Sequence, residues 1–142
     1  MSTDPDCIFC KIVAGEIPAA TVADDDSVIA FMDINPVTSG HLLVVPKGHY
    51  PSLGSIPGEV ASRMMETAQG LGEALRKSAI RTEGINLWLA DGAAAGQEVF
   101  HAHLHVIPRW SGDGFRLSAS RGEAPTGDDL AGQAAAIRVA ID

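Results

Sequence analysis

Five histidines are the residues of this sequence with the clearest capacity for chemistry. Three of them alternate with apolar residues in the segment FHAHLHVI, and they are His101, His103 and His105. A β-strand sends every second side chain to the same face. On a strand these imidazoles would form a row at steps of about 6.6 Å, while the residues between them enter the core. Imidazole can act as a nucleophile, an acid or base, and a ligand. The row therefore predicts a functional site; an exposed strand face that happens to carry histidines is the alternative interpretation.

A glycine-bearing loop leads into this row, because residues 96–100 are GQEVF. Backbone N–H groups of such a loop can turn toward an anion, and neighbouring imidazoles suit phosphate oxygens. Gly92 and Gly96 are equally compatible with an ordinary hairpin connection. The loop and the row together favour a phosphoryl group as the ligand.

Cys7 and Cys10 form a C-x-x-C pair. The first residues contain no basic region followed by an apolar stretch, so we expect no secretory signal, a cytoplasmic location and reduced thiols. A reduced pair of this kind binds a metal or takes part in redox chemistry. A structural zinc site needs two further ligands, whereas a thioredoxin-like redox pair needs a preceding strand, for which residues 1–6 leave little room.

The chain has 142 residues and a mass of 14.8 kDa, which predicts one domain with its own core. A composition of 46% hydrophobic and 20% charged residues excludes a disordered chain, and no apolar run is long enough to cross a membrane. The formal net charge of -8 disfavours nucleic acid or an anionic bilayer as a partner. We expect residues 1–6 to be a flexible leader and residues 7–142 to be a single domain.

Four strands are predicted from apolar runs rich in β-branched residues. They cover residues 27–33, 41–46, 85–90 and 100–107, and Pro108 ends the last of them. Mostly turns, rather than helices, separate these strands. The fold class is therefore α+β, with an antiparallel sheet and one helix across a face.

Three helices are predicted beside the strands. Apolar residues at steps of three and four predict a long helix from Pro57 to about Ala79. A short helix is expected near the two cysteines and ends at Gly15. A final amphipathic helix would use the apolar residues Leu130, Ala134, Ile137 and Ile141.

Residues 101–107 fit the pattern His-x-His-x-His followed by two apolar residues, and so resemble the histidine triad (HIT) superfamily. Residues 8–18 (IFCKIVAGEIP), 31–36 (FMDINP) and 40–47 (GHLLVVPK) also resemble family segments, in family order. The likeness covers residues 7–108 and is closest to the bacterial Hint-like branch. It implies a five-stranded antiparallel sheet with one long helix and short helices, a sheet extended across a homodimer, and a divergent tail from about residue 111.

The resemblance also implies catalytic roles for three histidines. His103 would attack the α-phosphorus of a nucleotide and form a nucleotidyl-histidine that water then resolves. His105 would contact the phosphate and help to protonate the leaving group, and His41 would orient the nucleophile. Backbone N–H groups around Gly96, Gln97 and Val99 would hold the charged oxygens of the transition state.

The nucleoside half would occupy an apolar pocket beside these histidines. Asp33 would accept hydrogen bonds from the ribose hydroxyls, although an aspartate before a turn is also typical of local backbone bonding. The base pocket would be formed by Ile8, Phe9, Ile17, Phe31 and Ile34, which an ordinary apolar core would equally contain. The expected ligand is a purine nucleoside monophosphate or a derivative of it.

Zinc-bearing Hint-like relatives complete a C-x-x-C pair with two histidines, which here would be His49 and His101. Together with Cys7 and Cys10 they would form a tetrahedral S₂N₂ site for Zn²⁺. We expect this zinc to be structural and the hydrolysis to need no metal.

Two positions depart from the family pattern. Ala90 stands where Hint-like members often carry Asn or Gln, so one amide expected near the phosphate is missing. Glu98 stands where many relatives place Ser or Thr, and a carboxylate there would repel an anion unless it points away or meets Arg109 or Lys47.

The sequence thus predicts a hydrolase that cleaves a nucleoside 5'-phosphoramidate or a related nucleotidyl bond. One alternative is a catalytically weak nucleotide-binding or scaffold protein. Another is a dinucleoside polyphosphate hydrolase or nucleotidyltransferase.

Overall fold

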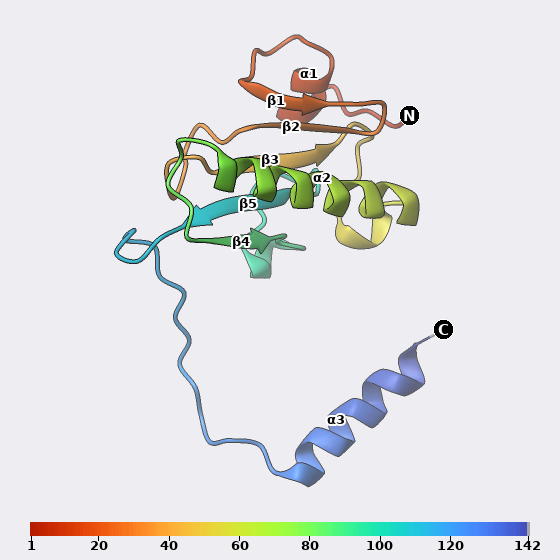
Figure 1. Ribbon diagram of the computed structural model, residues 1–142. Coiled ribbons are helices and arrows are strands. Elements are labelled where there is room, and N and C mark those ends of the chain that lie inside the picture. The colour runs from red at the N-terminus through yellow and green to blue at the C-terminus, as the bar shows by residue number, and fades with distance from the viewer. Residues whose placement is uncertain (142) are drawn as a thin grey trace.

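A five-stranded antiparallel sheet forms the centre of the computed structural model, which describes residues 1–141 (Figure 1). Its strand order is β1-β2-β3-β5-β4, and every neighbouring pair is antiparallel. The strands are β1 (Thr21–Asp24), β2 (Val28–Met32), β3 (Leu42–Pro46), β4 (Gly84–Trp88) and β5 (Leu104–Arg109). The predicted fold class and the implied five-stranded sheet are confirmed.

Helix α2 (Gly58–Lys77) lies across one face of the sheet. It starts after Pro57, and its buried residues recur at helical spacing, as the sequence predicts. Met64, Ala68 and Leu71 pack on the side chains of β2, β3 and β5 that point toward the helix. This cluster is the main core of the protein.

Helix α1 (Ile8–Val13) covers part of the opposite face. Phe9 packs edge-to-face on Phe31 of β2, with ring centroids 5.7 Å apart. Because α1 and α2 lie on opposite faces, β2 and β3 are buried on both sides, and their sequences are continuous apolar runs rather than alternating ones.

The histidine segment alternates as predicted, but its strand begins later. Ala102, Leu104 and Val106 enter the α2 core. The regular strand starts only at Leu104, so the predicted start at residue 100 is wrong. Before the strand, the N–H of Ala102 donates to the carbonyl of Tyr50 at 2.7 Å. Tyr50 lies in a loop, so no strand pattern in the sequence could predict this hydrogen bond.

Pro108 does not end this strand, because β5 continues to Arg109. Pairing with β3 has already stopped at Val106, so the missing N–H of proline leaves no gap in the ladder on that side. Its carbonyl instead accepts a hydrogen bond from Thr38 Oγ1 at 2.7 Å.

Strand β1 was not located by the sequence patterns. Its side chains are mostly exposed, so its sequence carries no alternation of buried and exposed residues, and only pairing with β2 makes it a strand. The remaining elements are two short 3₁₀ helices, η1 (Leu53–Ser55) and η2 (Ala93–Ala95), and α3 (Gly127–Ala140).

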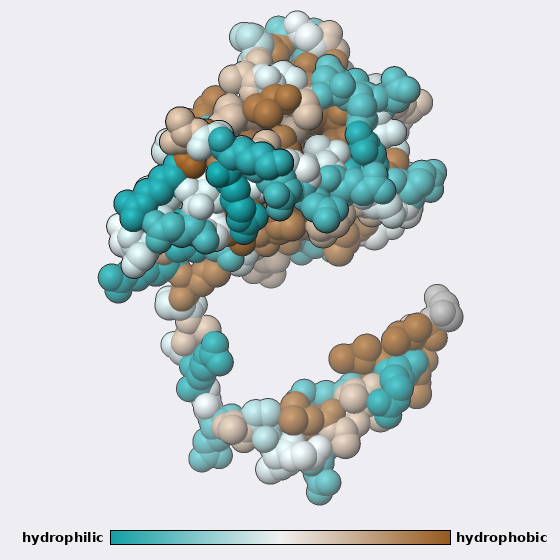
Figure 2. Space-filling view, viewed as in Figure 1, coloured by the Kyte–Doolittle hydropathy of each residue, from teal (hydrophilic) through white to brown (hydrophobic). Residues whose placement is uncertain are grey.

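Helix α3 confirms the predicted C-terminal helix. A capping box of Thr126 and Asp129 begins it, and the segment from Trp110 to Thr126 has no regular structure. The helix stands away from the sheet (Figures 1 and 2) and leaves Leu130 and Ile137 exposed, so the expected apolar face packs on nothing within residues 1–141. In that range, no helix is both long and apolar enough to cross a membrane.

Replacing Met64 with alanine tests the α2 core. Met64 is 3% exposed in the centre of the cluster, so Met64→Ala leaves a cavity and should lower the free energy of unfolding by about 2–5 kcal/mol. The adjacent Met65 is 53% exposed, and Met65→Ala should change it by less than about 1 kcal/mol. Urea unfolding measures both variants, and equal losses would contradict the placement of α2.

Candidate active site

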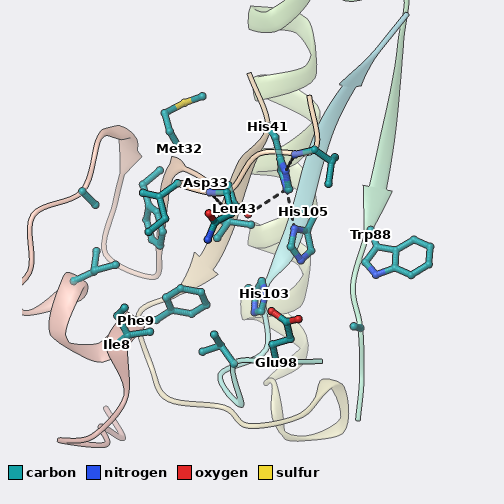
Figure 3. Close-up of a pocket in the computed structure, with 18 of the residues that line it drawn as sticks. Ile8, Phe9, Met32, Asp33, His41, Leu43, Trp88, Glu98, His103 and His105 are labelled. Carbon is teal, nitrogen blue, oxygen red and sulfur yellow. Dashed lines mark hydrogen bonds and ion pairs between the residues drawn. The ribbon is translucent and has the colours of Figure 1, made fainter. Parts of the chain in front are cut away.

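One cavity of about 460 Å³ opens on the face of the sheet that carries α1 (Figure 3). Every residue to which the sequence assigned catalysis or nucleotide binding lines it: Ile8, Phe9, Ile17, Phe31, Asp33, Ile34, His41, Gly96, Gln97, Val99, His103 and His105. These residues come from α1 and the turn after it, β2, the segment between β2 and β3, the loop after η2, and the start of β5 with the residues just before it. The fold therefore brings together side chains that are far apart in the sequence.

His103 projects into this cavity with its proton position fixed. Its Nδ1 lies 2.8 Å from the carbonyl oxygen of His101. A carbonyl can only accept, so Nδ1 must carry the hydrogen and Nε2 keeps a free lone pair. Burial lowers the pKa of His103, although the carbonyl bond and the charge of Asp33 act in the opposite direction. The ring is thus a neutral imidazole whose free lone pair is on Nε2.

His41 and His105 form a hydrogen-bonded chain in which the tautomer of each ring is determined by its neighbour. The backbone N–H of Val37 donates to His41 Nδ1 at 3.1 Å, so the hydrogen of this ring is on Nε2. That Nε2–H donates to Nδ1 of His105 at 2.8 Å. His105 therefore carries its own hydrogen on Nε2. No sequence signal marks Val37 for this role, because a backbone group performs it.

Burial keeps both rings neutral. It lowers the pKa of His41, against an opposing effect of Asp33. It lowers the pKa of His105 to about 4, and the neighbouring His103 and His41 add to the effect. His105 consequently offers an N–H donor without a positive charge at neutral pH.

Asp33 forms the local turn bond, which is one of the two roles that the sequence left open. Oδ1 accepts the N–H of Asn35 at 2.8 Å, the local turn bond expected before Asn35-Pro36. Oδ2 lies 3.5 Å from Nε2 of His41. The side chain is 17% exposed, so this second oxygen remains open to a ligand in the cavity.

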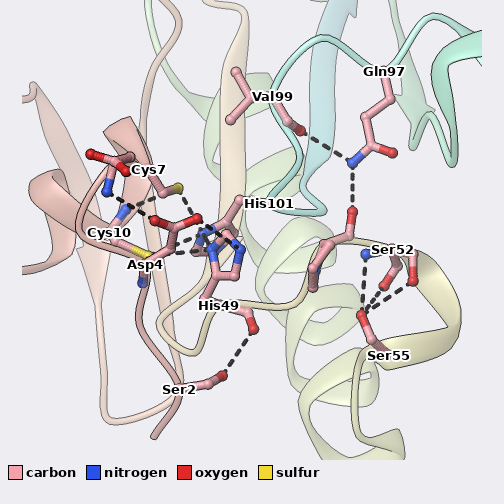
Figure 4. A network of polar contacts seen from close by, with 12 residues as sticks. Ser2, Asp4, Cys7, Cys10, His49, Ser52, Ser55, Gln97, Val99 and His101 are labelled. Carbon is pink, nitrogen blue, oxygen red and sulfur yellow. Dashed lines mark hydrogen bonds and ion pairs between the residues drawn. The ribbon is translucent and has the colours of Figure 1, made fainter.

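The loop between η2 and β5 is held by a buried glutamine (Figure 4). Gln97 Oε1 accepts the N–H of Gly92, while its Nε2 donates to the carbonyls of Pro51 and Val99. Gly96 takes a φ of 89°, a left-handed conformation that favours glycine. The amide of Gln97 is therefore committed to positioning the loop.

Two of the N–H groups expected to bind an anion are committed as well. Those of Gly96 and Gln97 donate to the carbonyls of Ala93 and Gly92. The N–H groups of Glu98 and Val99 meet no acceptor within residues 1–141. Any backbone cradle for an anion in this loop therefore consists of residues 98 and 99.

Cys7, Cys10, His49 and His101 form a second cluster beside the cavity (Figure 4). The Nδ1 atom of His101 lies 3.4 Å from Cys7 Sγ, 3.6 Å from Cys10 Sγ and 3.3 Å from His49 Nδ1. A tetrahedral zinc with Zn–S bonds of about 2.3 Å and Zn–N bonds of about 2.1 Å separates its ligand atoms by about 3.4–3.8 Å. The ligand atoms are already spaced for a tetrahedral ion.

The protonation of the cluster also suits a cation. His101 Nε2 lies 2.8 Å from the carbonyl of Pro46 and must donate to it, so Nδ1 faces the sulfurs without a hydrogen. Burial raises the pKa of Cys10, because removal from water disfavours the charged thiolate. Sequence reasoning missed Asp4, whose carboxylate lies 3.7 Å from His49 Nε2.

The row of three histidines thus serves two sites. His101 turns into the Cys/His cluster, whereas His103 and His105 line the cavity. The cavity also contains Trp88, which the sequence analysis did not assign. Trp88 pairs with His105 across β4 and β5, a register that a sequence without its fold does not reveal.

Comparison with known proteins places this arrangement in a family. The family model described as "HIT domain" matches residues 14–112. A solved HIT family protein from Bacillus subtilis is 35% identical, covers 96% of this chain and 98% of its own, and superposes with a TM-score of 0.88. A Zn-bound histidine triad family protein from Mycobacterium smegmatis is 37% identical, covers 96% of this chain and 98% of its own, and superposes with a TM-score of 0.76.

One characterised relative carries an enzyme name. Adenylylsulfatase HINT3 of Arabidopsis thaliana is 41% identical over 115 residues, which are 81% of this chain and 58% of that protein. The family match, the shared fold and the histidine row in its cavity agree with one another. This chain therefore belongs to the HIT domain family.

Proposed function

We propose that this protein hydrolyses nucleoside 5'-phosphoramidates through a covalent nucleotidyl intermediate on His103. One observation carries the proposal: the carbonyl of His101 holds the Nδ1 hydrogen of His103, so that its Nε2 lone pair faces the cavity. The family relation supports the general class, because a solved relative from Candida albicans is described as a histidine triad nucleotide-binding protein and the Arabidopsis relative is named an adenylylsulfatase.

A purine nucleoside fits the apolar side of the cavity. Ile8 and Phe9 of α1, together with Phe31, Ile17 and Ile34, offer a slot for a flat base. Asp33 Oδ2 is positioned to accept the ribose hydroxyls. With the nucleoside seated there, its 5'-phosphate reaches toward His103 and the N–H groups of residues 98 and 99.

The proposed reaction has two steps. A substrate protonated on its bridging nitrogen is attacked by His103 Nε2; a new N–P bond forms, the old P–N bond breaks, and the amine leaves with the electron pair. A water molecule then attacks phosphorus. The His103–P bond breaks, the lone pair returns to Nε2, and the water proton passes to the released amine. His105 Nε2–H donates to a phosphate oxygen in both steps.

We also propose that Cys7, Cys10, His49 and His101 hold a structural zinc ion. The spacing of their ligand atoms and the hydrogen-free Nδ1 of His101 fit a tetrahedral ion, and the Mycobacterium smegmatis protein is a zinc-bound relative. A bound ion would connect α1, which carries the base slot, to the segment that carries His103. Its contribution is to position these elements, while the reacting groups are the cavity's own side chains.

His103→Ala tests the nucleophile. With adenosine 5'-phosphoramidate, the variant should lose at least about a thousandfold in kcat, because no other group can form the intermediate. Acid quenching of the wild-type reaction should trap one adenylyl group on His103 by mass spectrometry. Calorimetry with AMP is the control and should show binding by both proteins. Full turnover by the variant contradicts the mechanism, and AMP binding without wild-type turnover indicates a nucleotide-binding protein instead.

The pH dependence of His105 tests the neutral hydrogen-bond chain. Its pKa of about 4 predicts that NMR will show an uncharged Nε2–H ring from pH 7.5 down to about pH 5. Because the same ring titrates near 6.5 when unfolded, its contribution to the free energy of unfolding is complete above pH 6.5 and is lost as the pH falls toward 4. A midpoint near 6.5 in the folded protein contradicts the buried arrangement.

Metal analysis of freshly purified protein tests the zinc site. We expect about one zinc per chain, and a Cys7→Ser/Cys10→Ser variant should lose the metal and unfold at a lower temperature. His103→Ala should keep its zinc, because His103 lies outside the cluster. A wild-type protein without stoichiometric zinc contradicts the site, and a disulfide in its place would favour the redox interpretation.

A further inference from the structure

Glu98 places a carboxylate in the cavity next to the proposed nucleophile. It belongs to the loop between η2 and β5, and its side chain points toward His103 in the close-up (Figure 3). The loop is fixed on both sides of it. Gln97 is buried with its amide bonded to three backbone groups, one of which is the carbonyl of Val99. The backbone around Glu98 is therefore fixed, while its side chain lines the cavity and is exposed to solvent.

No cation neutralises this carboxylate within residues 1–141. The two cations that could have met it are committed elsewhere. The guanidinium of Arg109 binds Asp113 through Nε at 2.6 Å and Asn86 through Nη1 at 2.5 Å. The ammonium of Lys47 binds Asp24 at 2.5 Å. The side chain of Glu98 also lines the cavity instead of pointing away from it. Its charge is therefore neither paired with Arg109 or Lys47 nor directed away from a bound anion.

The rest of the cavity supplies no positive charge. Its lining contains no lysine or arginine among the described residues. Burial lowers the pKa of His41 and His105, which keeps these two rings neutral at pH 7. The other carboxylate, Asp33, is engaged by Asn35 and faces His41. Glu98 and Asp33 are thus both carboxylates without a cationic partner among the described residues of this cavity, and Asp33 alone is engaged by hydrogen bonds.

The position of Glu98 determines which part of a bound substrate lies near its carboxylate. In Figure 3, Ile8 and Phe9 stand on one side of His103, and Glu98 and Trp88 stand on the other. A nucleoside seated on the apolar wall, with its phosphorus at His103 Nε2, directs the departing group toward Glu98. The carboxylate then interacts with the leaving group more than with the base or ribose.

We propose that Glu98 selects the leaving group by charge, favouring amines that carry a positive charge and disfavouring carboxylates and polyphosphates. This inference rests on the proposed phosphoramidate hydrolysis and names the substrate class within it: nucleoside 5'-phosphoramidates of diamines, in which one nitrogen is bonded to phosphorus and the other is a free, protonated amine. The same electrostatics weigh against dinucleoside polyphosphates, whose leaving group is an anion.

Three matched substrates test this selection. Adenosine 5'-phosphoramidates of 1,3-diaminopropane, butylamine and β-alanine present a cationic, a neutral and an anionic end at similar length. Wild-type kcat/KM should fall in that order. The cationic and anionic substrates should differ roughly tenfold at low salt, because one terminal charge is attracted and the other repelled at several ångströms in a partly solvated site.

Glu98→Gln keeps the shape of the side chain and removes its charge. In this variant the ratio of kcat/KM between the cationic and anionic substrates should approach one, and added salt should no longer change it. Glu73→Gln is the matched control, because Glu73 is exposed on α2 and lies outside the cavity. It changes the net charge equally and should keep the wild-type ratio. An unchanged ratio in Glu98→Gln overturns the proposal.

A binding measurement separates this inference from the proposed reaction. ADP carries a second phosphate where the leaving group would lie, whereas AMP does not. Glu98→Gln should strengthen ADP binding several-fold relative to AMP binding in calorimetry, and Glu73→Gln should not. If no phosphoramidate is hydrolysed but this shift occurs, the reaction fails and charge selection stands. If hydrolysis occurs without any shift in either experiment, charge selection fails alone.

Discussion

One constraint governs the functional half of this molecule: alternate residues of the segment 101–106 must be buried beneath α2. Ala102, Leu104 and Val106 fill the main core, where their exposed fractions are 7% or less. Burying apolar surface there is the dominant stabilising contribution, and it leaves the intervening imidazoles no other face. Packing on one side of the segment thus determines chemistry on the other.

Backbone carbonyl and N–H groups then set the protons of these imidazoles. His103 and His101 each donate to a carbonyl, and a backbone N–H donates to His41. Because a peptide group cannot exchange its role as donor or acceptor, each ring is restricted to one neutral tautomer. Hydrogen bonds to carbonyls thus leave a free lone pair on His103 Nε2 in the cavity-lining row and on His101 Nδ1 in the Cys/His cluster.

The neutrality of the rings has an electrostatic consequence for the whole cavity. A site that binds phosphate commonly supplies lysine or arginine, but this cavity relies on N–H donors and uncharged imidazoles. Any fixed charge within it therefore acts with little competition. For this reason we propose that the charge of Glu98, although the residue is partly screened by solvent, affects the choice of leaving group.

The sequence alone determined the alternating histidine face and the periodicity of α2. It also predicted the antiparallel architecture and the family resemblance of the chain. It missed β1, placed the start of β5 too early and took Pro108 as its end, because each of these depends on hydrogen bonds to residues distant in the chain. The tertiary structure alone decided which imidazole faces which partner, that Gln97 is committed to the loop, and that Lys47 and Arg109 bind aspartates rather than Glu98. Spacing along a chain specifies the direction of side chains within one element, but contacts between elements depend on how those elements pack.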